Sequence, residues 1–309
     1  GDRIYAVDGS NLIEQNVPQA DLTTLLKGES GSKVKLGVHR PLTKKNYTIT
    51  VTRGKVPINS VSVSYMLDDS IGFIKLDRFS ETTTDEFYTA LSKLKKQGLK
   101  ALILDLRDNP GGLLKAAISI SDEFLDDKKL IVYTKERSGS VNYTYAKKKG
   151  IFEKGKLIVL LNEGSASASE IVSGAVQDWD RGVVIGRRSF GKGLVQRPFR
   201  LPDGSVVRLT IARYYTPSGR SIQKSYENGT EEYYKDFANR FEQGELMHAD
   251  SIDFPDSLKF QTSKGRTVYG GGGIMPDYFI PMDSSFNYSY YNQHGAIIRE
   301  YSLEYYNKI

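Results

Sequence analysis

The stretch "LKALILDLRDNPGGLLKAAISISDEFL" (residues 99–125) joins a nearly continuous apolar run, a turn with paired glycines and an amphipathic segment. We expect a buried strand over 99–106 and a helix over 112–125. The same order returns downstream, where "KLIVLLN" (156–162) precedes "SASEIVSGAVQDW" (167–179). Apolar strands that alternate with helices are typical of a largely parallel sheet with helices on both faces.

The segments around this pattern complete the expected fold. Residues 70–76 and 182–186 are predicted strands, and 83–98 is a predicted amphipathic helix. The region from about 193 to 215 is rich in strand-forming residues, whereas the polar stretch 225–260 has the pattern of a helical insertion. We therefore predict a mixed α/β (α+β) fold with a parallel-rich sheet, helices and an added β-rich segment.

Residues 1–54 have a pattern of their own. "GDRIYAVDGS" predicts a short strand between two turns, and "QADLTTLLKG" predicts a helix that ends at Gly28. Two alternating segments, "KVKLGVHR" and "KNYTITVTR", predict a half-buried hairpin. The chain begins without a methionine or a signal peptide, so we expect a fragment whose targeting sequence lies outside it.

The composition indicates a globular protein. Hydrophobic residues make up 39% and charged residues 26%, and no apolar run approaches the roughly 20 residues that span a bilayer. The net charge of +6 is scattered, and "KKK" (147–149) is more typical of a solvated turn than of a nucleic-acid site. The absence of cysteine excludes disulfides and thiolate metal sites.

The stretch "GSASASEI" (164–171) places three serines at alternate positions before an apolar run. The three histidines of the chain lie far from it in sequence, so a nucleophilic serine here would need another base. One interpretation is structural, because Ser167 and Glu170 have the spacing of a capping box at a helix start. The other is catalytic, because a helix that follows a buried parallel strand begins at the edge where α/β proteins place their sites.

Two further segments could belong to such a site. Gly111 and Gly112 allow backbone N–H groups to approach a ligand, although a plain turn explains them equally well. Lys192 and Gln196 are four residues apart, and on a regular strand this even spacing points both side chains the same way. A lysine between two glycines and before an apolar strand is partly desolvated, which favours the neutral amine that a base requires.

Two other motifs point to functions that we consider weaker. "GRRSFGKG" (186–193) matches a phosphate loop, but Gly193 replaces the required Ser or Thr and a strand-like segment follows instead of a helix. "SKLK" (92–95) has the S-x-x-K spacing of penicillin-binding acyltransferases, but it lies on the polar side of a helix and its companion motifs are missing.

Five motifs together resemble the carboxyl-terminal processing (tail-specific) proteases, which are Ser-Lys endopeptidases. They are "LDLRDNPGGLL" (104–114), "GSASASEI" (164–171), "GRRSFGKGLVQ" (186–196), "LTIARYYTPSGRSIQ" (209–223) and "GRTVYGGGGIMPD" (265–277). The resemblance covers roughly residues 1–285. It implies a Ser-Lys protease core over 55–285 and a truncated PDZ domain over 1–54. The remaining residues, 286–309, are an aromatic-rich tail by composition.

The same resemblance assigns roles to single residues. It implies Ser167 as the nucleophile, Lys192 as the general base and then acid, and Gln196 as the residue that orients the lysine. It places the oxyanion donors on the backbone of Ala168 and of the Gly111–Gly112 turn. Ser165 and Ser169 are then structural, and no metal or other cofactor is required.

The resemblance also implies partners and a location. The substrates would be proteins with free C-termini, recognised by the PDZ module, whose carboxylate-binding loop lies before the first residue of this sequence. We expect export to the bacterial cell envelope, with a signal peptide in the full-length protein and no nucleic-acid partner; a homo-oligomer stays open. The alternative function is a non-catalytic peptide-binding scaffold of the same fold.

Overall fold

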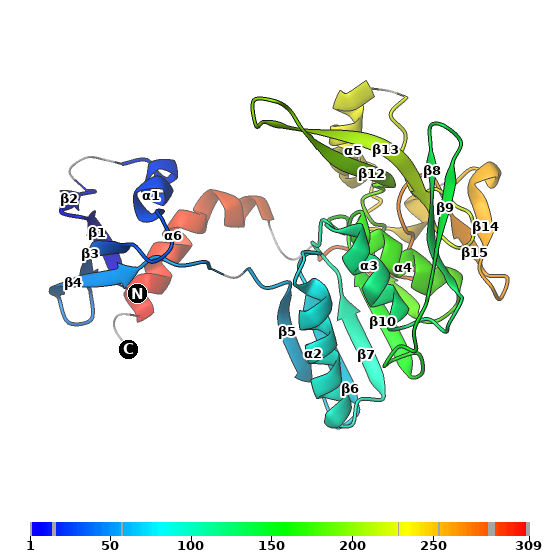
Figure 1. The fold of residues 1–309 in the computed structure, drawn as a ribbon, viewed down its shortest axis with the longest axis horizontal. Helices are drawn as coiled ribbons and strands as arrows, with labels where there is room; N and C mark the ends of the chain where they lie inside the picture. Colours follow the sequence, from blue (N-terminus) through cyan, green and yellow to red (C-terminus); the bar gives the residue numbers. More distant parts are fainter. Residues whose placement is uncertain are drawn as a thin grey trace. The chain divides into compact units, whose positions relative to one another are not determined.

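The computed structural model describes residues 2–13, 17–56, 58–227, 229–252, 254–283 and 288–306. The chain divides into two compact units, one formed by 1–58 with 283–309 and the other by 59–282 (Figure 1). The predicted boundaries near 54 and 285 lie close to these divisions. The assignment of the first unit to part of a PDZ domain stays a prediction.

The first unit is built on an antiparallel sheet with the strand order β2-β1-β3-β4. The hairpin predicted from its alternating pattern is present as β3 and β4, and Val34 and Val38 point into the unit's buried side. The elements of the unit are β1 (Arg3–Val7), β2 (Ser10–Asn11), α1 (Gln19–Leu26), β3 (Lys33–Arg40), β4 (Lys45–Thr52) and α6 (Tyr288–Tyr306).

The second unit is built on a six-stranded sheet with the order β16-β11-β10-β7-β6-β5, in which only β5 runs antiparallel to its neighbour. The strands predicted at 70–76, 99–106, 156–162 and 182–186 are all in it. Its members are β5 (Val61–Met66), β6 (Ile71–Leu76), β7 (Ala101–Asp105), β10 (Lys156–Leu161), β11 (Val183–Gly186) and β16 (Tyr278–Phe279).

Three helices cover one face of this sheet, so the expectation of helices on both faces is wrong. They are α2 (Thr83–Lys96), α3 (Leu114–Asp122) and α4 (Ala168–Asp178), and they pack side by side (Figure 1). The reason is the strand order: the chain passes from β6 to β7, β10 and β11 in one direction, and right-handed crossovers then place every helix on the same side. Leu104 and Val159 are accordingly fully buried, whereas Ile103, on the opposite face, is half-buried.

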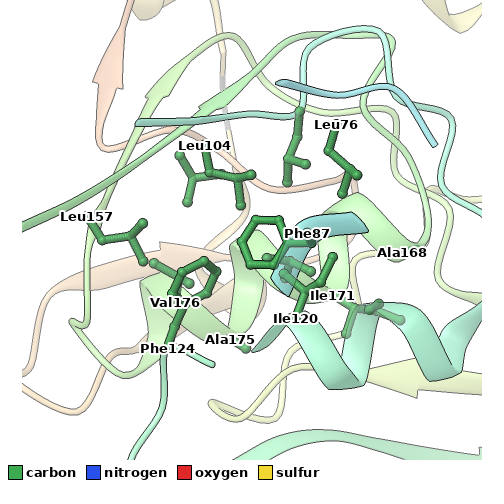
Figure 2. Packing of buried hydrophobic residues seen from close by; sticks show 14 of the residues in the cluster. Leu76, Phe87, Leu104, Ile120, Phe124, Leu157, Ala168, Ile171, Ala175 and Val176 are labelled. Atoms are coloured by element: carbon green, nitrogen blue, oxygen red, sulfur yellow. The ribbon is translucent and has the colours of Figure 1, made fainter. Parts of the chain in front are cut away.

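The core lies between the sheet and this helical layer (Figure 2). Phe87 of α2 meets Phe124 edge to face, with the ring centroids 5.9 Å apart, and both are fully buried. Every residue of α4 is buried, because this helix also contacts β8 of a second sheet. The helix that begins next to Ser167 is therefore packed against both sheets.

The β-rich segment forms the second sheet, which is antiparallel and has the order β12-β13-β8-β9. The predicted insertion is helical over only part of its length and ends in a short hairpin. These elements are β8 (Leu130–Glu136), β9 (Val141–Tyr145), β12 (Leu194–Arg200), β13 (Val206–Tyr215), α5 (Gly229–Glu242), the 3-10 turns η1 (Ala249–Ser251) and η2 (Asp256–Leu258), β14 (Lys259–Gln261) and β15 (Thr267–Tyr269). No helix in the described ranges is both long and apolar enough to cross a membrane.

Candidate active site

One cavity of about 500 Å³ brings all the sequence-predicted site residues together. It opens where β7 and β10 end and the next segments of the chain begin, which is the expected edge of a parallel sheet. Much of its wall is apolar, with side chains from Phe79, Leu114, Ile171 and Val195. The predicted residues that line it are Gly111, Gly112, Ser167, Ala168, Lys192 and Gln196.

The paired glycines follow β7 in a turn that strongly favours glycine. Gly111 has φ +92° and Gly112 has φ +146°, which side-chain-bearing residues rarely adopt. A Cβ on Gly112 would lie 2.0 Å from the carbonyl oxygen of Phe79. The N–H of Gly111 donates to Asn109 Oδ1 at 2.9 Å. Within the described residues, the N–H of Gly112 has no such acceptor and borders the cavity.

The three alternating serines have different surroundings. The hydroxyl of Ser165 is fully buried, donates to the carbonyl of Leu106 at 2.8 Å and accepts from the N–H of Asn162 at 3.0 Å. The hydroxyl of Ser169 is also fully buried and donates to the carbonyl of Asn109 at 2.9 Å. Both therefore join the 164–171 segment to the turn after β7. Of the three, Ser167 alone lines the cavity.

The backbone of Ser167 is strained. Its φ of +54° and ψ of −109° lie outside the regions that ordinary residues occupy. Such conformations cost of order 1–3 kcal/mol and are found mainly at functional sites. Ser167 and Glu170 form the predicted capping box, and its carboxylate half is strong, at 2.7 Å from the Ser167 N–H. The N–H of Glu170 donates to the Ser167 carbonyl at 2.9 Å. In the described structure, its contact with the Ser167 hydroxyl does not have the geometry of a regular cap hydrogen bond.

Glu170 is fully buried and connects Ser167 to the segment that carries Lys192. Besides the Ser167 N–H, its carboxylate accepts from Ser189 Oγ at 2.5 Å, from the Gly191 N–H at 2.7 Å and from the Lys192 N–H at 2.9 Å. Burial raises the pKa of the Glu170 carboxyl. The four donors act against this effect, because three of them are N–H groups that only donate and so favour the carboxylate.

Lys192 and Gln196 line the same cavity, but not for the reason that their spacing suggested. Lys192 lies before β12, which begins at Leu194, and opposite Val195 and Gln196 the pairing skips Ile211 of β13. The even-spacing argument requires both residues to lie in one strand, so it does not apply to Lys192. Lys192 is half-buried and Gln196 is exposed. Among the described residues, no hydrogen bond joins the Lys192 amine to the Ser167 hydroxyl, and such bonds often tighten only when substrate is bound.

Two features of the structure concern the side chains that would ligate a metal ion and the backbone that would bind a phosphate. Within the described residues, no three His, Cys, Asp or Glu side chains gather in a way that could hold a metal. The segment that matches a phosphate loop continues into β12, whereas phosphate binding by that motif requires the N-terminus of a helix.

Comparison with known proteins decides the family. The model for Peptidase family S41 matches residues 70–232, more than half of the chain. The chain belongs to peptidase family S41. This confirms the resemblance found in its five motifs.

Two curated relatives and one solved structure show what the chain is similar to. It is 39% identical over 225 residues to the carboxyl-terminal-processing protease of Picosynechococcus sp., a match that covers 72% of this chain and 53% of that protein. It is 39% identical over 223 residues to the carboxy-terminal processing protease CtpA of Bacillus subtilis, covering 72% and 47%. A putative S41 protease from Bacteroides fragilis has the same fold, with a TM-score of 0.53 at 16% identity over 98% of this chain and 73% of that one. The chain spans about half the length of the first two relatives.

Sequence reasoning missed one residue of the candidate site, Tyr214 of β13. Its ring is buried in the cavity wall, and its hydroxyl lies 3.0 Å from the Ser167 carbonyl and also contacts the Lys192 carbonyl. Burial raises the pKa of this phenol well above its usual value, so it stays protonated and can donate. The motif "LTIARYYTPSGRSIQ" contains Tyr214, but nothing in the pattern shows which of its aromatic residues faces the site.

We predict that Gly111→Ala destabilises the protein more than Gly139→Ala and also abolishes the activity proposed below. Both glycines have φ +92°, so both variants bear the same backbone penalty, of order 1–2 kcal/mol. At Gly139 the added Cβ meets nothing within 4 Å, whereas at Gly111 it lies 2.8 Å from the Ser167 Cβ and 2.6 Å from the Ala166 carbonyl. Overpacking should cost Gly111→Ala about 1–3 kcal/mol more in chemical denaturation. Equal losses of stability for the two variants would contradict the packing of Gly111 on the serine segment.

Proposed function

We propose that this chain is a serine endopeptidase that cuts protein substrates near their C-terminus through Ser167 and Lys192. The observation that carries the proposal is the single cavity in which Ser167, Lys192 and Gln196 meet the backbone of Gly112 and Ala168. The relatives named carboxyl-terminal-processing proteases support the same reaction class.

The first step is acylation of Ser167. Its hydroxyl gives a proton to the Lys192 amine while Oγ bonds to the substrate carbonyl carbon. The negative charge that develops on the carbonyl oxygen is stabilised by the N–H groups of Gly112 and Ala168 and by the positive end of α4, which begins at Ala168. We favour Gly112 over Gly111 as a donor because the Gly111 N–H is already bound to Asn109.

The second step frees the enzyme. Acylation ends when the oxyanion collapses, the C–N bond breaks and Lys192 gives its proton to the leaving amine. In the second step Lys192 takes a proton from a water molecule whose oxygen bonds to the acyl carbon, and passes this proton to Ser167 Oγ as the ester bond breaks. Gln196 orients the lysine amine by hydrogen bonding. An uncharged partner suits this role, because a carboxylate there would stabilise the protonated amine, which is not a base. These steps require no metal or cofactor.

We assign two parts of substrate recognition to the two units separately. The apolar wall of the cavity, which includes Leu113, Leu114 and Ile171, suits an apolar side chain next to the bond that is cut. We assign recognition of the free C-terminus to a PDZ module of which residues 1–54 are part, and we place the enzyme in the bacterial cell envelope. The alternative, a non-catalytic peptide-binding scaffold, has the same cavity but no turnover.

We predict that alanine variants of the three serines separate activity from stability. Ser167→Ala should lose essentially all cleavage of an unstructured peptide and at most about 1 kcal/mol of stability, because the bond from the Ser167 N–H to the Glu170 carboxylate does not depend on the hydroxyl. Ser165→Ala should keep cleavage per folded molecule within a modest factor, but it leaves the buried N–H of Asn162 without its partner, at about 1–3 kcal/mol, while the Leu106 carbonyl keeps the Asn109 N–H at 3.2 Å. Ser169→Ala should cost less stability, because the Asn109 carbonyl keeps the Ala166 N–H as a partner. Normal cleavage by Ser167→Ala would show that the nucleophile is a different residue.

We also predict that Lys192→Ala and Lys192→Arg both abolish cleavage and leave the fold intact. Arginine keeps the positive charge but cannot release its proton at working pH, so it cannot act as a base. Turnover would be measured across a pH range, with circular dichroism as the control for folding. Substantial turnover by Lys192→Arg at any pH would remove Lys192 from the role of base.

A further inference from the structure

The segment that carries Lys192 has no regular structure of its own. Residues 187–193 connect β11 to β12 without forming a helix or a strand. Their conformation is therefore set by hydrogen bonds to other parts of the chain. Glu170 takes the N–H groups of Gly191 and Lys192, and Gln223 Oε1 takes the N–H of Gly193 at 2.9 Å.

The carbonyl groups of the same segment are held from the insertion. Arg240, near the end of α5, donates through Nη2 to the Arg188 carbonyl at 2.7 Å and through Nη1 to the Ser189 carbonyl at 3.2 Å. These two residues lie four and three positions before Lys192. The side chain of Arg240 is only 4% exposed, and its planar guanidinium fixes both carbonyls in one geometry.

A buried carboxylate locks this contact in place. Glu245 accepts from Arg240 Nε at 2.7 Å and from Arg188 Nε at 2.8 Å, and it pairs with Arg188 Nη2 at 2.5 Å. One glutamate thus bridges an arginine of the lysine-bearing segment and an arginine of α5. Because buried charges are costly when they lose a partner, this arrangement resists any shift of the segment relative to the helix.

A second contact holds the side chain of Phe190, two residues before Lys192. The Lys224 amine lies 4.0 Å from the Phe190 ring centroid and 4.2 Å from that of Tyr233 in α5. The same amine is 3.1 Å from Asp236, also in α5. Phe190 and Tyr233 themselves meet edge to face, with centroids 6.0 Å apart. Helix α5 of the insertion therefore contacts both the backbone of residues 187–193, through Arg240, and the Phe190 side chain, through Tyr233.

We infer that the insertion acts as a brace for the base, and that Arg240 is a positioning residue for Lys192. This inference rests on the proposed function, because it assumes that Lys192 removes the proton from Ser167. Arg240 is not among the residues that line the cavity, so we expect it to act on the site through the Arg188 and Ser189 carbonyls. Loss of its two hydrogen bonds removes the support of the Arg188 and Ser189 carbonyls, while the Ser189 N–H keeps the Ile274 carbonyl and the Ser189 hydroxyl keeps Glu170. A displacement of about 1 Å in a reacting group costs on the order of 10²-fold in rate.

The test compares Arg240→Ala, Arg240→Lys and a control on the same helix, Lys235→Ala, in peptide cleavage well below the melting temperature. Lys235 is exposed and pairs only with Glu231 within α5. We expect kcat to fall about 100-fold in Arg240→Ala with KM within about twofold of the wild type, because misplacement of the base slows the chemical step and not binding. Arg240→Lys should recover part of kcat, since an ammonium can reach one carbonyl but not both. Lys235→Ala should keep both constants.

Three results would overturn the brace. The first is a wild-type kcat in Arg240→Ala with only a lower melting temperature, which would make the residue structural alone. The second is a rise in KM with kcat unchanged, which would place it in substrate binding. The third, if Arg240→Ala does not fold, is a wild-type kcat in a folded Arg240→Lys. Ser167→Ala in the same assay separates the two proposals: if it cleaves normally, the proposed function fails, whatever the Arg240 variants do.

Discussion

The buried carboxylate of Glu170 is the interaction on which the candidate site depends. It lies in the first turn of α4 and binds the N–H of the serine that precedes that helix, together with three donors from the segment before β12. The positive end of α4 and the four donors stabilise a charge that burial alone would disfavour. Because α4 is enclosed between the main sheet and β8, the position of Glu170 is set by the core. Through Glu170, the core sets the positions of both Ser167 and the Lys192 segment.

The remaining supports of the site extend this arrangement outward. Ser165 and Ser169 bind the turn after β7, which brings Gly112 and Ala168 to the same cavity. Tyr214 contacts the carbonyls of both Ser167 and Lys192 from β13. Arg240 and Glu245 hold the Lys192 segment from the insertion. Each segment that carries a residue of the proposed reaction is thus held by contacts with residues distant in sequence.

The sequence predicted those features of the fold that depend on residues close together in the chain. Apolar runs predicted the strands of the main sheet, and the spacing of Ser167 and Glu170 predicted the capping box at the start of α4. The covering of the sheet on one face was not predictable, because it follows from the order in which the strands are arranged. The register shift beside Gln196 and the direction of Tyr214 depend on pairing between β12 and β13, which the pattern of either segment alone does not show. The role of the insertion was hidden for the same reason, since Arg240 and Ser189 are 51 positions apart.

The most direct test of the account is to map where a serine-reactive phosphonate binds. The wild-type protein would be treated with the reagent, digested and analysed by peptide mass spectrometry, with Ser167→Ala as the control. The account predicts one adduct, on Ser167 within the peptide that contains 164–171, with loss of cleavage in proportion to labelling and no adduct in the variant. An adduct on Ser165 or on a serine outside the cavity, or full cleavage by protein whose Ser167 is completely modified, would contradict it.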